Sequence, residues 1–297
     1  DFELEFVGAR KESYTRDSRN PIVEDGSLED DQIRRDFTIN AMAFALHPES
    51  FGSLLDPFNG MQDLEKKIIK TPLEPDVTYS DDPLRMMRAI RFASQLDFKI
   101  VDASLHSIKK NAERLSIVSR ERITEELQKI LQSPRPSVGL QLADELNLLP
   151  QIFPELISLK GVEEIEGQTH KDNFYHTLEV VDNISRNTNN VWLRWAALLH
   201  DIGKPATKRF EKGAGWTFHG HEFVGSKMVP RIFKRLKLPL NEKMKYVKKI
   251  VMLSSRPIGL AQDIVTDSAV RRLLTTGELL VLVLAIVQAD RGWIDWN

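Results

Sequence analysis

The stretch that decides the fold is Asp81-Asp82-Pro83-Leu84-Arg85-Met86-Met87-Arg88-Ala89-Ile90-Arg91-Phe92. Its apolar residues recur three and four positions apart, which predicts an amphipathic helix. Ser80 is expected to cap this helix, and Pro83 fits its first turn. Arginines at every third position share one helical face, and Asp82 can lie beside Arg85. The sequence therefore predicts a helix that presents several guanidinium groups together.

These side chains have the chemistry to recognise a nucleotide. A carboxylate accepts from an exocyclic amine, and a guanidinium donates to ring nitrogens or carbonyls. Asp82 and Arg85 together can therefore match the Watson-Crick edge of cytosine or adenine. Further arginines suit a triphosphate, because their fork geometry matches phosphate oxygens. The alternative is a helix whose arginines lie in solvent or pair with acids, and spacing alone favours that alternative.

A second stretch lies upstream: Arg34-Arg35-Asp36-Phe37-Thr38-Ile39-Asn40-Ala41-Met42-Ala43. Ser27 followed by Asp30 predicts a helix that begins near Leu28 and ends at the arginine pair. A further helix is expected from Thr38 to Phe44. Arg35 could meet a phosphate, and Asp36 or Asn40 could bond a ribose hydroxyl. Alternatively, Asp36 caps the second helix and Asn40 is satisfied locally.

The two stretches resemble motifs B and D of the class II tRNA nucleotidyltransferases and bacterial poly(A) polymerases. Three other stretches fit the same family. Residues 1–12 resemble its strand ending in Ala-Arg-x-Glu, and Leu55-Asp56-Pro57-Phe58-Asn59-Gly60 with Asp63-Leu64 resembles its hinge motif C. Arg120-Glu121-Arg122-Ile123 with Glu126 resembles motif E. Five motifs in the family's order, over residues 1 to about 155, are far more specific than one short pattern.

The resemblance implies template-free addition of C, C and A to tRNA 3′ ends from CTP and ATP, assisted by Mg²⁺. It implies that Arg35 binds nucleotide phosphate and that Asp36 and Asn40 lie in the ribose-reading motif. Asp82 and Arg85 would pair with the base. The remaining implied roles are completion of the nucleotide site by Arg88 and Arg91, support of its helix by Glu121, Arg122 and Glu126, and a third catalytic carboxylate at Glu5.

The sequence departs from the family in one respect: it contains neither the Gly-Gly-x-x-Arg-Asp loop nor the Asp-x-Asp metal pair. The adjacent pairs Asp30-Asp31 and Asp81-Asp82 cannot replace the latter, because neighbouring residues do not face one site. Residues 2–7 alternate as in a half-exposed strand without a partner. The chain is therefore expected to be an N-terminally truncated fragment with weakened nucleotide binding and no polymerisation activity.

A second group of residues suits a divalent metal ion. An apolar helix from Trp192 to Leu199 delivers His200 and Asp201, and Gly203 and Pro205 should end it. With His176, His219 and His221, this pattern resembles the HD phosphohydrolase domain, and the resemblance implies Asp290 as its last metal ligand. For any one of these histidines alone, a structural role is the better interpretation. The domain could hydrolyse phosphate esters or serve as a scaffold that grips the tRNA acceptor arm.

Composition sets broad limits. The chain has 297 residues, no cysteine and a net charge of −2, which argues against indiscriminate nucleic-acid binding. Residues 231–249 are nevertheless basic, and they form either a solvated face or a phosphate contact. The longest apolar run, residues 279–287, is too short to span a membrane. The lack of cysteine fits a cytoplasmic protein.

These observations predict a mainly α-helical fold in three parts. Residues 1–46 are expected to be the last part of an α/β nucleotidyltransferase head, residues 47–160 a helical neck that reads the nucleotide, and residues 161–297 an HD-type helical domain. Residues 275–297 look unlike the expected continuation. CCA addition is the first functional hypothesis. A bacterial poly(A) polymerase and a metal phosphohydrolase acting on tRNA ends or nucleotides are the alternatives.

Overall fold

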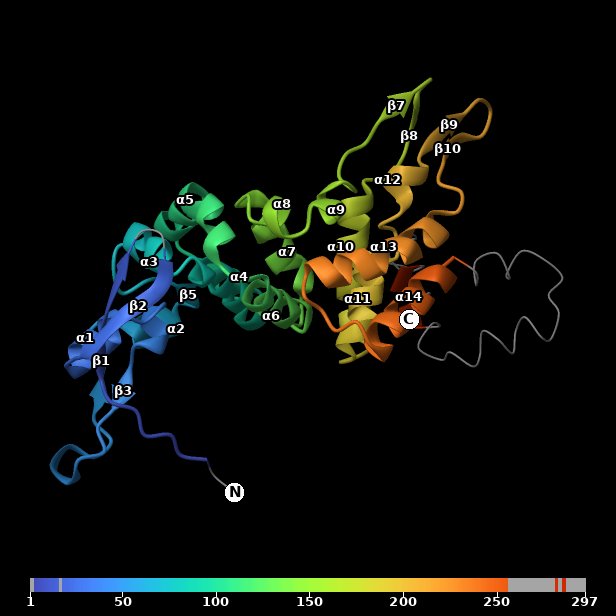
Figure 1. Ribbon diagram of the computed structural model, residues 1–297. Coiled ribbons are helices and arrows are strands. Elements are labelled where there is room, and N and C mark those ends of the chain that lie inside the picture. The colour runs from blue at the N-terminus through green and yellow to red at the C-terminus, as the bar shows by residue number, and fades with distance from the viewer. Residues whose placement is uncertain (1–2, 16–17, 256–280, 283–284, 287–297) are drawn as a thin grey trace, which may run out of the picture.

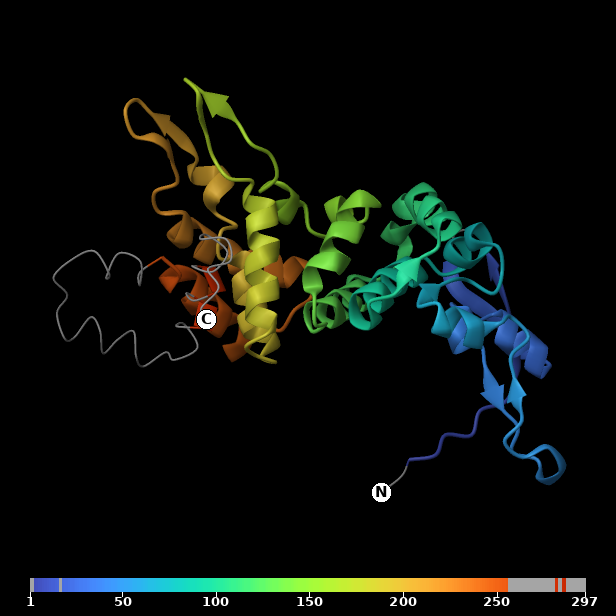
Figure 2. The same ribbon diagram turned by 180° about the vertical axis from the view of Figure 1, so that it is seen from behind.

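The computed structural model describes residues 3–15, 18–255, 281–282 and 285–286 of the chain. These residues form an elongated molecule in which the elements follow one another in chain order, from a small β-containing end to a larger helical end (Figure 1, and from behind in Figure 2). Helices dominate it and the strands are short, which confirms the expected mainly α-helical fold. Among the described residues, none of the helices has the length and hydropathy that a transmembrane span requires.

The first part is a β-hairpin followed by a short helix. Strand β1 (Arg10–Thr15) pairs antiparallel with β2 (Ser18–Asp25), and α1 (Leu28–Ile33) begins at Ser27. Ser27 and Asp30 form a reciprocal capping box, as the sequence predicts. The strand expected over residues 2–7 is wrong, because the described residues 3–9 belong to no strand.

A compact turn region links this hairpin to the neck. Its elements are the 3-10 helices η1 (Thr38–Asn40) and η2 (Pro48–Ser50), the paired strands β3 (Ala43–Phe44) and β4 (Leu54–Leu55), and α2 (Gly60–Glu65). The helix expected from Thr38 to Phe44 is wrong, because only the three residues of η1 are helical there. Asp56 accepts from the backbone N–H groups of Gly60 (2.6 Å) and Met61 (2.9 Å) and so caps α2.

Gly60 is required here by close packing. A Cβ at this position would lie 2.3 Å from the carbonyl oxygen of Thr38. The Thr38 hydroxyl also donates to Asp63 in α2, at 2.7 Å. The stretch that resembles motif C therefore holds η1 in place, and η1 follows directly on Arg35 and Asp36.

The neck is built around α4 (Leu84–Leu96), which packs against α6 (Arg120–Leu131) and α7 (Pro136–Glu145). Its fully buried residues include Met86, Met87, Ala89 and Ile90, which confirms the amphipathic pattern. The other elements are α3 (Pro75–Asp81), α5 (Asp102–Asn111), η3 (Ala112–Ile117) and the parallel pair β5 (Ile68–Ile69) and β6 (Lys99–Ile100). Ser80 lies inside α3, so the cap expected there is wrong. Instead, the Asp82 carboxylate accepts from the N–H of Leu84 at 3.2 Å.

The last part is a helical bundle with two projecting hairpins. Helices α10 (Asn173–Ser185), α11 (Val191–Leu199), α13 (His221–Arg235) and α14 (Glu242–Leu253) form the bundle. Short helices α8 (Leu149–Ile152) and α9 (Pro154–Ile157) precede it, and α12 (Lys204–Thr207) lies within it. The hairpins are β7 (Glu164–Ile165) with β8 (Gln168–Thr169), and β9 (Arg209–Glu211) with β10 (Gly215–Thr217).

Buried polar contacts join the neck to this bundle. The Arg194 side chain is 3% exposed, and its guanidinium donates to the carbonyl oxygens of Leu131, Ser133, Ser185 and Thr188 at 2.7–3.1 Å. It thus satisfies carbonyls at the C-terminal ends of both α6 and α10, which the helices themselves leave unpaired. A second contact joins the N-terminus of α7 to Asp182 in α10, through the backbone N–H and hydroxyl of Ser137 (2.9 and 2.6 Å).

Candidate functional site

A cavity of about 470 Å³ lies between the segment that follows α1 and the beginning of α4. Its lining residues are Arg34, Arg35, Asp36, Asn40, Asp82, Arg85, Arg88, Phe92 and Arg122. The two stretches singled out in the sequence therefore meet at one cavity, although they lie far apart in the chain. Five guanidinium groups against two carboxylates give this cavity a positive character, which suits a polyanionic ligand.

Arg85 and Asp82 reach the cavity from the start of α4. Arg85 is buried, and its Nη2 donates to the carbonyl oxygen of Arg34 at 2.7 Å. Its guanidinium carbon lies 6.0 Å from the centroid of the Tyr14 ring. Burial, together with the hydrogen bond to Glu12, raises the pKa of Tyr14 well above its usual value, so the phenol stays neutral. Arg85 is thus held from two sides in a fixed orientation.

Asp36 organises the opposite wall. Its carboxylate is 7% exposed and forms an ion pair with Arg88 at 2.6 Å. It also accepts from the Asn40 side-chain amide and from the backbone N–H of Phe37, both at 3.0 Å. Asn40 is thus satisfied locally, as one of the two sequence interpretations expects. Asp36 fixes the positions of Arg88 and Asn40 at the cavity wall.

The arginine pair is held by Asp31 of α1. Arg35 forms an ion pair with it at 2.8 Å while remaining about half exposed, and Arg34 bonds both Asp31 and Glu12. Burial opposes ionisation of Asp31, but hydrogen bonds from Arg34 and Arg35 outweigh it and lower the pKa of that carboxyl. Arg34 was not singled out by the sequence reasoning, although its place beside Arg35 is the signal that could have found it. Phe92 was missed too, because an aromatic residue on an amphipathic helix looks like core.

Several predicted site residues do not line the cavity. Arg91 forms an ion pair with the buried Glu126 at 2.9 Å, which joins α4 to α6 behind the cavity. Glu121 is exposed and lies 3.9 Å from Lys237. Glu5 is exposed and lies outside the lining residues. Arg122, by contrast, belongs to the cavity wall.

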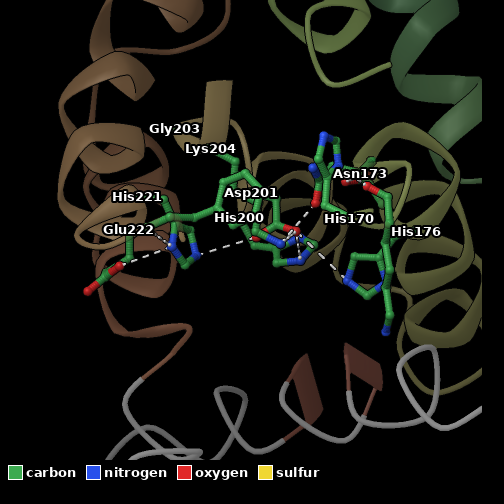
Figure 3. A network of polar contacts seen from close by, with 12 residues as sticks. His170, Asn173, His176, His200, Asp201, Gly203, Lys204, His221 and Glu222 are labelled. Carbon is green, nitrogen blue, oxygen red and sulfur yellow. Dashed lines mark hydrogen bonds and ion pairs between the residues drawn. The ribbon is translucent and has the colours of Figure 1, made fainter. Parts of the chain in front are cut away.

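A second cavity, of about 220 Å³, is lined by four of the predicted metal ligands, His176, His200, Asp201 and His221 (Figure 3). His176 from α10 meets His200 and Asp201, which follow α11, and ligand atoms of these three buried residues lie within 4.8 Å of one another. The Nε2 atoms of His200 and His176 lie 3.3 and 3.8 Å from Oδ2 of Asp201. His221, at the start of α13, brings its Nε2 to 3.4 Å from Oδ1.

The ring tautomers suit a cation at this cluster. Nδ1 of His200 contacts the carbonyl oxygen of Ala197 at 2.7 Å, and Nδ1 of His221 contacts that of Phe218 at 2.9 Å. A carbonyl only accepts, so each Nδ1 carries a proton, and in the neutral ring Nε2 then has a lone pair that can bind a metal ion. The buried Nε2 of His200 has no hydrogen-bond partner among the described residues. Acceptors that face a carboxylate in this way fit a divalent metal ion.

Asp201 is ionised in this environment. Burial raises its pKa, but His200 and Lys204 outweigh burial and hold the pKa well below its usual range. The Lys204 ammonium lies 2.7 Å from Oδ2. Gly203 allows this assembly, because a Cβ there would lie 2.1 Å from the carbonyl oxygen of His221. The glycine thereby lets the start of α13 approach Asp201.

Of the other two predicted metal ligands, the structure describes only His219. His219 is exposed and does not line the cavity. Asp290 lies outside the described residues, as do most of residues 275–297. Sequence reasoning did not single out the remaining wall, which comes from distant segments: Asn173, Phe218, Ser254, Ser255 and Ile286.

Comparison with known families gives three matches along the chain. Residues 1–70 match the poly A polymerase head domain, and residues 97–159 match a domain described as the probable RNA and SrmB-binding site of polymerase A. Residues 173–291 match the HD domain. The order agrees with the order of motifs in the sequence.

Similar proteins agree with these matches. An A-adding tRNA nucleotidyltransferase of Deinococcus radiodurans is 34% identical over 275 residues, which is 89% of this chain and 60% of that protein. A multifunctional CCA protein of Hahella chejuensis is 36% identical over 222 residues, 72% of this chain and 50% of that protein. The chain thus spans about half to 60% of the length of these relatives.

Solved structures show the same fold. A tRNA nucleotidyltransferase complexed with a primer tRNA and an ATP analog matches with a TM-score of 0.63 at 23% identity, covering 94% of this chain and 73% of that one. The Bacillus stearothermophilus CCA-adding enzyme in complex with CTP matches with a TM-score of 0.62 at 25% identity, covering 91% of this chain and 57% of that one. With the head, RNA-binding and HD matches in this order, the chain belongs to the tRNA nucleotidyltransferase and poly(A) polymerase family that carries an HD domain.

Proposed function

We propose that this chain carries the nucleotide-selecting part of an enzyme that adds CCA to the 3′ ends of tRNA from CTP and ATP. The observation that supports this proposal is the shared cavity of Asp82 and Arg85, with further arginines around it. Relatives named as an A-adding tRNA nucleotidyltransferase and a multifunctional CCA protein support the same interpretation. The cysteine-free composition fits a cytoplasmic location, which stays a prediction.

Base selection follows from the chemistry of the two side chains. Cytosine and adenine present an exocyclic amine that can donate to the Asp82 carboxylate, and acceptor atoms beside it that can receive from Arg85. Uracil and guanine present a carbonyl oxygen at the place of that amine, which would face the carboxylate as a second acceptor. The pair thereby favours CTP and ATP over UTP and GTP.

The other cavity residues would bind the rest of the nucleotide. Arg35 and Arg122 are exposed enough to meet the triphosphate, and Asn40 stands beside Asp36 near the expected ribose. Asp36 is engaged by Arg88 and Asn40, and Asp82 anchors the start of α4. The described residues therefore do not fit a Mg²⁺ site for nucleotidyl transfer at this cavity. The proposal for this chain is accordingly limited to nucleotide selection.

The test is nucleotide binding by calorimetry with CTP, ATP, UTP and GTP. Wild-type chain should bind the first two more tightly, roughly 5- to 100-fold, as expected for one bidentate base contact. Arg85→Ala should remove this preference. Arg35→Ala should weaken the binding of all four nucleotides alike, because phosphate contacts do not distinguish the bases. Equal losses for all four nucleotides in Arg85→Ala would contradict the proposal.

The same measurement separates the family's alternatives. An enzyme that adds CCA must bind both CTP and ATP, whereas an A-adding enzyme or a poly(A) polymerase needs ATP alone. Comparable affinity for CTP and ATP would favour CCA addition. A tRNA that lacks its CCA end, compared with an unrelated RNA of equal length, then tests whether the RNA partner is tRNA.

A second candidate function belongs to the HD cavity. We propose that it is a divalent-metal phosphohydrolase site for phosphate esters of tRNA ends or nucleotides. His176, His200, Asp201 and His221 would hold the ion, which would activate water or polarise a phosphate. Lys171 and Lys204 line the same cavity and would attract the phosphate group. These cations are the observation that favours hydrolysis over a purely structural scaffold.

Release of product from a 2′,3′-cyclic nucleotide with added Mn²⁺ or Ni²⁺ tests this second function. Activity and bound metal should both be lost in Asp201→Ala and kept in His219→Ala, because His219 lies outside the cavity. Unchanged metal content in Asp201→Ala would contradict a metal centre here. Metal binding without any hydrolysis would favour the scaffold.

A further inference from the structure

A third cavity, of about 330 Å³, lies at the N-terminal end of α11. Its wall is formed by Asn190, Trp192, Glu242, Lys243 and Tyr246, from the beginnings of α11 and α14. His200 follows the other end of the nine-residue α11, about 14 Å away along the helix axis. The cavity is therefore separate from the metal centre, and it lies outside residues 97–159, which match the RNA-binding family.

Two partly exposed aromatic rings line this cavity. The Trp192 ring lies 6.2 Å from the buried Phe233 ring, which supports it from within the bundle. The Lys243 ammonium lies 5.1 Å from the centroid of the Trp192 ring. Tyr246, one turn further along α14, lies on the same helical face as Lys243. Aromatic walls beside an ammonium group fit a planar ligand that carries negative charge.

A basic surface adjoins the cavity. Residues 231–249 run from the end of α13 into α14 and contain a single acid, Glu242; their exposed cations are Arg231, Lys234, Lys237, Lys243, Lys245, Lys248 and Lys249. Lys245 pairs with Glu242 at 2.6 Å and Lys237 lies 3.9 Å from Glu121. Within the described ranges the others form no ion pair. Lys249, three residues after Tyr246, continues the face that holds the cavity.

We infer that this cavity binds an unpaired segment of RNA, with one base against Trp192 and Tyr246 and the flanking phosphates on Lys243 and Lys249. Bases stack on aromatic side chains when they are free of a duplex, and lysines track the backbone. A duplex would meet the lysines but keep its bases away from the rings. An acidic peptide would likewise leave the rings unused. The inference does not depend on the function of the nucleotide cavity.

Photo-crosslinking locates the site directly. An unstructured RNA of about 12 nucleotides carrying 5-bromouracil is bound to the full chain and irradiated, and the crosslinked peptides are identified by mass spectrometry. Saturating ATP is present, so that the nucleotide cavity does not contribute. Crosslinks are expected on the peptides that contain Trp192 or Tyr246. Their absence from both peptides would overturn the inference.

Binding of the same RNA, measured by fluorescence anisotropy, tests the two kinds of contact. Tyr246→Ala should weaken binding of single-stranded RNA roughly tenfold, and Tyr246→Phe should restore it because the ring is kept. Lys243→Ala combined with Lys249→Ala should lower the salt dependence of log K by about 1.4, the value for two phosphates on a single strand. The matched control, Lys66→Ala with Lys212→Ala, removes two exposed charges elsewhere and should change neither quantity.

The comparison with duplex RNA of equal length completes the test. Tyr246→Ala should leave duplex binding unchanged. Equal effects of Tyr246→Ala on single-stranded and duplex RNA, or no effect on either, would overturn the base contact. Circular dichroism of each variant checks that the fold is kept, and Trp192→Phe offers a second ring substitution that preserves the contact with Phe233.

Discussion

Replacing Arg194 by methionine should destabilise the protein more than any exposed substitution. The side chain is 3% exposed and donates five hydrogen bonds to four carbonyl oxygens, from the ends of α6 and α10 and the segments that follow them. Methionine fills similar space but donates nothing. The carbonyl oxygens would then be buried without this donor, and most of the cost comes from that loss.

The magnitude can be estimated from these contacts. A hydrogen bond to a charged group contributes about 1.5–3 kcal/mol, but the guanidinium also loses its hydration on burial, so the five bonds do not add in full. Removing one side of a buried charged network costs about 3–5 kcal/mol. Since domains are stable by only about 5–15 kcal/mol, the melting temperature should fall by roughly 10 °C.

Chemical and thermal denaturation followed by circular dichroism measure this effect. Arg186→Met is the matched control: this arginine is exposed at the end of α10, and its replacement should change stability by less than about 0.5 kcal/mol. Because Arg194 joins the neck to the HD bundle, its variant should also unfold in two separate steps rather than one. A loss below about 1 kcal/mol with a single transition would refute the reasoning.

Three further predictions concern the two sites. His200→Ala should lower bound Mn²⁺ or Ni²⁺, measured by elemental analysis after dialysis, whereas His219→Ala should keep it, and equal metal content in both would count against the cluster. The lowered pKa of Asp31 means that its ion pairs stabilise the fold fully above the unfolded pKa of about 4 and lose this effect as the pH falls through the folded pKa. The stability difference between wild type and Asp31→Asn should therefore be constant at neutral pH and shrink in acid, and a difference that grew in acid would be inconsistent with this sign. Gly60→Ala should cost about 1–3 kcal/mol and weaken ATP binding, because its Cβ would overlap the Thr38 carbonyl, whereas Gly8→Ala has open space and should do neither.

Much of the fold could be predicted from local patterns. The capping box at Ser27 and the apolar spacing of α4 depend on neighbours within one helix, and both are confirmed. The prediction of a strand over residues 2–7 is wrong, because alternation of apolar and polar residues shows only that a segment would fit a pleated surface. Pairing requires a partner strand, and among the described residues β2 pairs with β1 instead.

The two sites could be predicted only in part, because their residues come from segments that are far apart in the sequence. The two arginine-rich stretches meet at one cavity, and the resemblance to a family supplied their joint meaning. Spacing could not reveal that Arg91 turns to Glu126 while Arg122, from another helix, faces the cavity. His219 and His221 are two residues apart, yet His219 lies exposed in the turn before α13, whereas His221 begins the helix and faces Asp201. The direction of each side chain depends on how the helices pack against one another, and this packing cannot be read from a single sequence.

The close approach of backbone at Gly203 has a consequence for the proposed metal site. Gly203 has only a hydrogen atom where any other residue would place its Cβ against the His221 backbone. An added methyl group would collide with this backbone and push the start of α13, which carries His221, away from Asp201. Gly203→Ala is therefore expected to alter metal binding at the proposed site, although Gly203 is not one of the proposed ligands.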